Sequence, residues 1–89
     1  MTKIIIKKLT QQELGTRRIP SWPVWEKEIS RFPWFYDNDE ECYIIEGDFI
    51  VEVDKEQYHI QKGDFVFFPA GLKCIWDIKA PVRKHYNFP

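Results

Sequence analysis

Residues 63–71 read Gly63-Asp64-Phe65-Val66-Phe67-Phe68-Pro69-Ala70-Gly71. The turn at Lys62-Gly63-Asp64 leads into a run that is apolar on both faces, and Pro69-Ala70-Gly71 ends that run. A short strand without alternation is typical of the centre of a β-sandwich, where protein covers both faces of the sheet. The stretch therefore predicts a buried strand between two sharp turns.

The segments before and after this strand alternate with a period of two. Cys42 to Val53 forms a hairpin-like stretch that Gly47-Asp48 is expected to interrupt, and its second half has one apolar face. Beyond Gly71, residues 73–79 alternate sharply, and Ala80-Pro81 is expected to end them. A last strand, 82–88, places four side chains on one face: Val82, Lys84, Tyr86 and Phe88.

The N-terminal third contains weaker signals. Lys3 to Lys8 is β-branched and predicts a first strand, and Thr10 with Glu13 forms a capping box for a short helix that ends near Gly15. Pro33 is expected to open another strand through Tyr36. Many short strands with at most one short helix predict an all-β sandwich or barrel, because a ferredoxin-like fold would need two long helices.

Composition excludes several classes of function. The 89 residues allow one domain, and their net charge of −1 with no basic stripe excludes nucleic-acid binding. No apolar run is long enough for a membrane span, and the three isoleucines after Lys3 are too few for a signal peptide, so a cytoplasmic protein is expected. Four Trp, four Tyr and seven Phe can fill a core or line a ligand pocket. The two cysteines, Cys42 and Cys74, form no CxxC motif and are expected to be reduced and buried.

Two motifs in this order resemble those of the RmlC-like cupin superfamily. Residues 63–71 look like its second motif, a Gly, five residues, Pro, one residue and Gly. Residues 40–47 look like the end of its first motif, a Glu, six residues and Gly. Residues 42–47 and 82–86, with Trp22 to Trp25, are similar to the cupin group that includes ureidoglycine aminohydrolase. The resemblance implies a double-stranded β-helix, or jelly-roll barrel, within a single domain 1–89: an N-terminal strand and helix in 1–20, and the barrel in 21–89.

The resemblance also implies that the metal ligands of this superfamily are replaced here. Its two histidines, glutamate and third histidine fall on Trp34, Tyr36, Glu40 and Cys74. Trp has no lone pair to offer, and Tyr binds a metal only after losing a proton with a high pKa. His59 and His85 are expected to point outward. We therefore expect no metal and no cofactor.

The resemblance places the side chains at the ligand positions, with their neighbours at period two, around one cavity. The predicted ligand-binding residues are Trp34, Tyr36, Glu40, Cys42, Cys74, Trp76, Lys84 and Tyr86. Glu40 is a candidate catalytic acid or base with a raised pKa, or it forms a structural hydrogen bond, and Lys84 is its natural charge partner unless it reaches out to the rim. Cys74 is a candidate nucleophile if Lys84 lowers its pKa, and is otherwise an inert thiol.

Three hypotheses for the function remain open. The barrel binds a small polar or anionic metabolite through Lys84, Tyr36 and the Trp rings, or it is a metal-independent isomerase or lyase that uses Glu40 with a Tyr or Cys74. In the third hypothesis aromatic rings plug the barrel, and the protein works through its surface. A metal-dependent hydrolase is least favoured. A homodimer is also expected, because the strand containing Ile4, Ile5 and Ile6 is apolar on both faces and would be an exposed edge.

Overall fold

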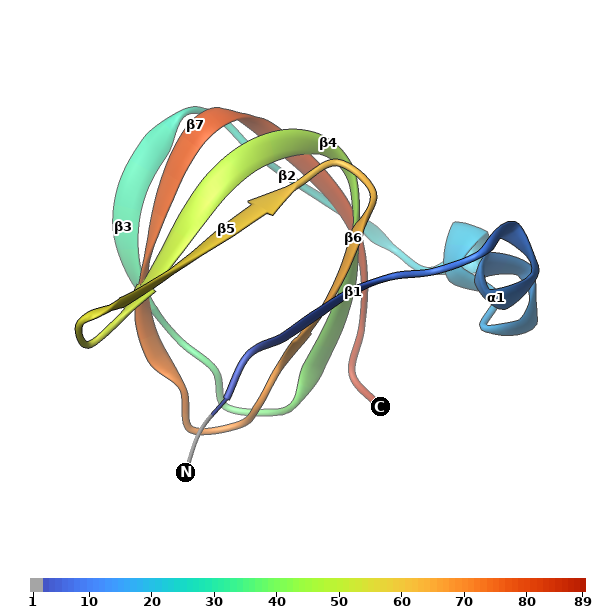
Figure 1. Cartoon of the computed structure of the whole chain (residues 1–89), viewed down its shortest axis with the longest axis horizontal. Coiled ribbons are helices and arrows are strands. Elements are labelled where there is room, and N and C mark those ends of the chain that lie inside the picture. The colour runs from blue at the N-terminus through green and yellow to red at the C-terminus, as the bar shows by residue number, and fades with distance from the viewer. Residues whose placement is uncertain (1–2) are drawn as a thin grey trace.

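The structure, a computed structural model, describes residues 3–89 as one antiparallel sheet rolled into a jelly-roll barrel (Figure 1). It contains β1 (Ile5–Lys8), α1 (Gln11–Thr16), a 3-10 turn (Ile19–Ser21), β2 (Val24–Lys27), β3 (Ser30–Phe35), β4 (Glu40–Val53), β5 (Glu56–Gln61), β6 (Asp64–Phe68) and β7 (Lys73–Asn87). The all-β prediction is confirmed. The helix lies outside the barrel wall (Figure 1), and within residues 3–89 no helix has the length and apolarity that crossing a membrane requires.

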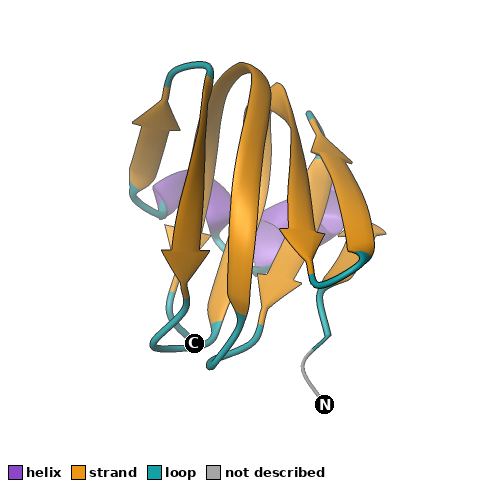
Figure 2. Cartoon of the chain, turned by 90° about the vertical axis from the view of Figure 1, so that its left-hand side faces the viewer, coloured by secondary structure: helices purple, strands orange, loops and turns teal. Residues whose placement is uncertain are grey.

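Two long strands, β4 and β7, hold the barrel together by pairing with each other along most of their length. The first half of β4 also pairs with β6, and its second half pairs with β5. In the same way β7 pairs first with β3 and then with β2, so each long strand passes from one half of the barrel wall to the other. Figure 2 shows the strands of the sheet side by side along the wall. Side chains from both halves therefore meet inside.

The sequence was expected to break at Gly47-Asp48 and at Ala80-Pro81, but both strands continue through these points. The pairing of β4 with β7 shifts register between Ile44 and Phe49, and these bulges form the bend in both strands. Gly47 has φ of 127°, and a Cβ there would lie 2.9 Å from the backbone of Val82. Because Pro81 stands opposite this irregular segment, its missing N–H breaks no regular pair in the ladder.

The N-terminal elements agree with the sequence in part. The Thr10–Glu13 capping box is present, and α1 extends through Thr16. β3 begins at Ser30 rather than at Pro33, because Pro33 lies inside the strand opposite Ile75. β1 starts at Ile5 and pairs with β6 in the barrel wall, at one end of the strand order. Ile5 is half exposed on this strand, and the homodimer stays a prediction.

Candidate functional site

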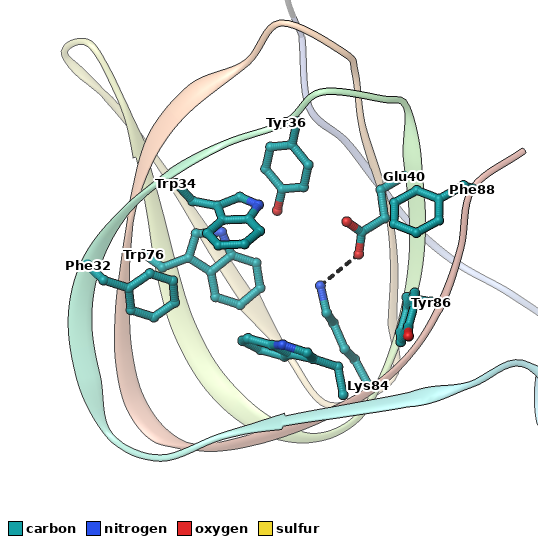
Figure 3. Close-up of a pocket in the computed structure, with 9 residues that line it drawn as sticks. Phe32, Trp34, Tyr36, Glu40, Trp76, Lys84, Tyr86 and Phe88 are labelled. Atoms are coloured by element: carbon teal, nitrogen blue, oxygen red, sulfur yellow. Dashed lines mark hydrogen bonds and ion pairs between the residues drawn. The ribbon is translucent and has the colours of Figure 1, made fainter.

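One end of the barrel contains a pocket of about 270 Å³. It is lined by Trp25, Phe32, Trp34, Tyr36, Glu40, Trp76, Lys84, Tyr86 and Phe88 (Figure 3). The register of β7 builds this wall, because it places Trp25 opposite Lys84 and Phe32 opposite Trp76 on neighbouring strands. Cross-strand partners share a face of the sheet, so both pairs point inward together.

The polar centre of the pocket is an ion pair between Glu40 and Lys84. Lys84 Nζ lies 2.9 Å from Glu40 Oε2, and Figure 3 shows the two side chains reaching toward each other from the paired strands β4 and β7. Their side chains are only 9% and 6% exposed. Two charges taken so far out of water need each other, because either one alone would lose its hydration without compensation.

Cys42 is the third member of this polar centre and contacts both charged groups. Its Sγ donates to Glu40 Oε2 at 3.0 Å and accepts from Lys84 Nζ at 3.3 Å. The thiol is fully buried, and burial raises its pKa far above the ordinary value, so it remains protonated. Cys42 therefore fixes the positions of both charges and is not a nucleophile.

The ammonium of Lys84 is otherwise surrounded by aromatic rings. It lies 4.9 Å from the ring centroids of both Trp25 and Trp76, a distance at which a cation is attracted to the face of an indole. Burial by itself lowers the pKa of Lys84, but its contacts with Cys42 and Glu40 outweigh this effect and raise the pKa above the ordinary value. Lys84 is therefore a fixed positive charge inside the barrel.

Two further polar groups of the pocket are buried without partners. The Tyr36 hydroxyl and the Trp76 indole N–H make no hydrogen bond of normal geometry within residues 3–89. The indole N–H lies near the hydroxyl oxygen and acts to lower the pKa of Tyr36, but the hydroxyl hydrogen has no acceptor, and a buried polar group without a partner costs about 1–3 kcal/mol. Burial, followed by the proximity of Cys42 and Glu40, raises the pKa of Tyr36 well above its usual value. The hydroxyl thus keeps its proton and can donate a hydrogen bond to a bound molecule.

Comparison with known proteins supports the same architecture. Residues 14–86 match the family described as the EutQ-like cupin domain. The chain belongs to this EutQ-like cupin family. A solved DUF861 family protein from Thermotoga maritima is 46% identical, with a TM-score of 0.95 over 98% of this chain and 100% of that one.

Two other solved relatives of this EutQ-like cupin are more distant and show the fold alone. A putative ethanolamine utilization protein Q from Salmonella typhimurium is 23% identical, with a TM-score of 0.65 over 93% of this chain and 66% of that one. The EutQ protein of Clostridium difficile is 22% identical, with a TM-score of 0.67 over 99% and 69% of the two chains. No protein of curated function is significantly similar in sequence.

The pocket of this EutQ-like cupin contains six of the eight residues that the sequence placed there: Trp34, Tyr36, Glu40, Trp76, Lys84 and Tyr86. Cys42 lies behind the ion pair, and Cys74 lies beside the backbone of Trp34. Three lining residues were missed: Trp25, Phe32 and Phe88. Phe88 shares the alternation of Tyr86 and could have been included. Whether Trp25 and Phe32 point into the barrel depends on strand pairings that the sequence does not reveal.

The proposed role of Cys74 as an activated nucleophile is not supported. Its Sγ lies 3.7 Å from the carbonyl oxygen of Trp34, to which it donates a weak hydrogen bond. Burial raises its pKa to about 11, and the opposing effect of Lys84 is smaller. The thiolate that nucleophilic attack requires is therefore scarce at neutral pH.

The residues at the superfamily's metal-ligand positions do not fit a divalent metal ion. The Tyr36 hydroxyl keeps its proton, and the Cys74 thiol is directed at a backbone carbonyl. The indole nitrogen of Trp34 has no lone pair with which to bind a metal. Within residues 3–89 no three His, Cys, Asp or Glu side chains gather closely enough to hold a metal. Both histidines lie away from the pocket: His59 is bonded to Asp48, and His85 to the carbonyl of Trp22.

Proposed function

We propose that this EutQ-like cupin binds a small organic molecule in the nine-residue pocket, without a metal. The observation that carries the proposal is the buried Glu40–Lys84 pair, which lies at the centre of an aromatic pocket that still contains unpaired polar groups. A pocket with a mostly apolar lining and a few convergent polar groups is the usual form of a ligand site.

The energetics of the pair support binding over a purely structural role. Replacing a buried ion pair by well-packed apolar residues is often neutral or stabilising. Leu or Met in place of Glu40 and Lys84 would therefore give the folded protein about the same stability. The pocket volume of about 270 Å³ also shows that the rings leave space between them. This space disfavours the hypothesis of a barrel plugged by aromatic side chains.

One observation favours an enzymatic alternative, an isomerase or lyase. Glu40 Oε1 accepts no hydrogen bond within residues 3–89, and the Tyr36 hydroxyl is free to donate. Glu40 could then take a proton from a carbon beside a carbonyl group while Tyr36 hydrogen-bonds to the carbonyl oxygen. Of the two partners that the sequence offered for Glu40, a Tyr or Cys74, this alternative uses Tyr36. Exchange of such a substrate proton for solvent deuterium, lost in Glu40→Gln, would distinguish catalysis from binding.

The tryptophans provide the test of binding. Trp25, Trp34 and Trp76 line the pocket, whereas Trp22 lies outside it, so the four indole N–H signals in an NMR spectrum separate pocket binding from surface binding. A panel of small aromatic and polar metabolites should contain compounds that shift the three pocket signals and leave the signal of Trp22 in place.

The same titration has two controls. EDTA should not change the binding, and Lys84→Met should abolish it under conditions in which circular dichroism shows that the variant is folded. A panel in which every active compound shifts Trp22 alone, or binds only before EDTA is added, would refute the proposal.

A further inference from the structure

Two complementary polar groups in the pocket face the same space without bonding to each other. Glu40 Oε2 is occupied by Lys84 and Cys42, but Oε1 accepts no hydrogen bond from residues 3–89. The Tyr36 hydroxyl, 3% exposed as a residue, also has no partner, and Figure 3 shows it pointing into the space beside the Glu40 carboxylate. A free acceptor and a free donor side by side match a ligand edge with a donor next to an acceptor.

The charge of the pocket favours an uncharged ligand. The carboxylate of Glu40 and the ammonium of Lys84 neutralise each other at 2.9 Å. The ammonium also contacts the Cys42 thiol and the faces of three aromatic rings, those of Trp25, Trp76 and Phe68. The other lining residues are all aromatic. A fully charged ligand group would lose its hydration here and gain no free counter-ion in return.

The rings at the mouth favour a flat ligand. Trp34 is 48% exposed and Phe88 is 58% exposed, although both line the pocket. Trp34 meets Phe32 and Tyr36 edge-on, with ring centroids 6.4 Å apart in both cases. An edge-to-face contact covers at most one face of each ring, and the exposed surface of Trp34 and Phe88 leaves room for a planar apolar body to stack.

We infer that the ligand is an uncharged, flat molecule with an amide edge, whose N–H donates to Glu40 Oε1 and whose carbonyl oxygen accepts from the Tyr36 hydroxyl. Aromatic amides and lactams have this chemistry. The inference rests on the proposed function, since it names the ligand class of the same pocket. Of the polar or anionic metabolite expected from the sequence it keeps the polar alternative and drops the anionic one, because the positive charge of Lys84 is already paired with Glu40.

Four probes with one shared ring test this class: benzamide, acetophenone, benzoate and benzylammonium. Each is titrated into the full chain while the indole signals of Trp25, Trp34 and Trp76 are followed. Benzamide should bind most tightly. Acetophenone, which has the carbonyl oxygen but no N–H for Glu40, should bind about tenfold more weakly, a loss of about 1.4 kcal/mol. The two charged probes should bind more weakly still.

Tyr36→Phe separates the ligand contact from folding. The variant removes a hydroxyl that has no partner in the structure, so the melting temperature should stay unchanged or rise. Benzamide should nevertheless bind about tenfold more weakly. Tyr58→Phe is the matched control, because its hydroxyl contacts Glu56 on the surface and its loss should leave benzamide binding unchanged.

The outcomes distinguish this inference from the proposed function. If benzoate or benzylammonium binds more tightly than benzamide through the pocket indoles, the ligand class is wrong and the pocket remains a binding site. If Tyr36→Phe leaves benzamide binding unchanged, the amide edge is wrong as well. If none of the four probes shifts the signals of the pocket indoles, the inference fails. The proposed function fails as well only if no compound of the broader metabolite panel shifts these signals.

Discussion

The barrel has two charge clusters of similar chemistry on opposite sides of its wall. Inside, Lys84 and Glu40 form a pair whose side chains are less than 10% exposed. Outside, Arg31 on β3 binds Glu52 on β4 at 2.8 Å and Asp77 on β7 at 3.2 Å, and the Arg31 side chain is 51% exposed. Both clusters join neighbouring strands, so the difference between them is the solvent.

This difference separates a contribution to folding from a requirement for function. Water screens the outer cluster and also hydrates its members when they separate, so its loss changes little. The inner pair has no such alternative, because each charge depends on the other for stabilisation. Natural barrels can place charges outside at little energetic cost, and a pair kept inside calls for a role beyond packing.

Removing one inner charge should produce the largest effect. Lys84→Met leaves the Glu40 carboxylate buried among aromatic rings, and we expect a loss of about 3–5 kcal/mol in the free energy of unfolding. The double variant Glu40→Gln with Lys84→Met should recover part of this loss, since no unpaired charge remains. Urea denaturation of the two single variants and the double variant measures the coupling. Effects that simply add would show that the two charges do not stabilise each other.

The pH dependence should be opposite for the two clusters. Contacts with Cys42 and Glu40 raise the pKa of folded Lys84 above 10.5 after the cost of burial, so the inner contribution is complete below about pH 10.5 and is lost as the pH rises through the raised pKa. Hydrogen bonds from Arg31 and Lys79 hold the pKa values of Glu52 and Asp77 below 4.5 and 3.8. The outer contribution is therefore present above these values and is lost in acid.

The measurement compares each variant with the unmodified chain across pH. The stability difference for Lys84→Met should shrink as the pH rises through the alkaline range, and the difference for Arg31→Met should shrink below about pH 4.5. A Lys84→Met difference that already declines near pH 8 would mean that the pKa of Lys84 is lowered in the fold.

Removing the outer cation should produce the smallest effect. Arg31→Met breaks the contacts with Glu52 and Asp77, but all three groups are accessible to water. The destabilisation should be well below that of Lys84→Met and should become smaller still in 1 M NaCl, where the screening length is about 3 Å. The Lys84→Met effect should change little with salt. Equal salt sensitivity of the two variants would place the inner pair in contact with bulk solvent.

The two inner charges could be placed from the sequence by separate arguments. Glu40 follows from the position of the first motif, and Lys84 follows from the period-two alternation that it shares with Val82 and Tyr86. Their contact in the barrel links two segments that are 44 residues apart. Alternation decides which face of a strand a side chain occupies, but only strand pairing decides what it meets there.

The missed features depend on pairing between distant strands. Trp25 and Phe32 line the pocket because β2 and β3 pair with different halves of β7. The continuation of β7 through Pro81 depends on the bulges opposite it in β4. The local sequence predicted that the strands break at Gly47 and Pro81. It contains no information about the partner strand, whose pairing lets each strand bend at these residues and continue.

The sequence by itself determined an all-β chain, a cupin-like pair of motifs and the inward face of the last strand, because turn residues and alternation are local properties of the backbone. Only the tertiary structure decided that Lys84 meets Glu40, that Cys42 holds both charges from behind, and that Tyr36 keeps a free hydroxyl. Hydrogen bonds and desolvation depend on distances of a few ångströms between strands far apart in the chain, and those distances are fixed only when the barrel closes.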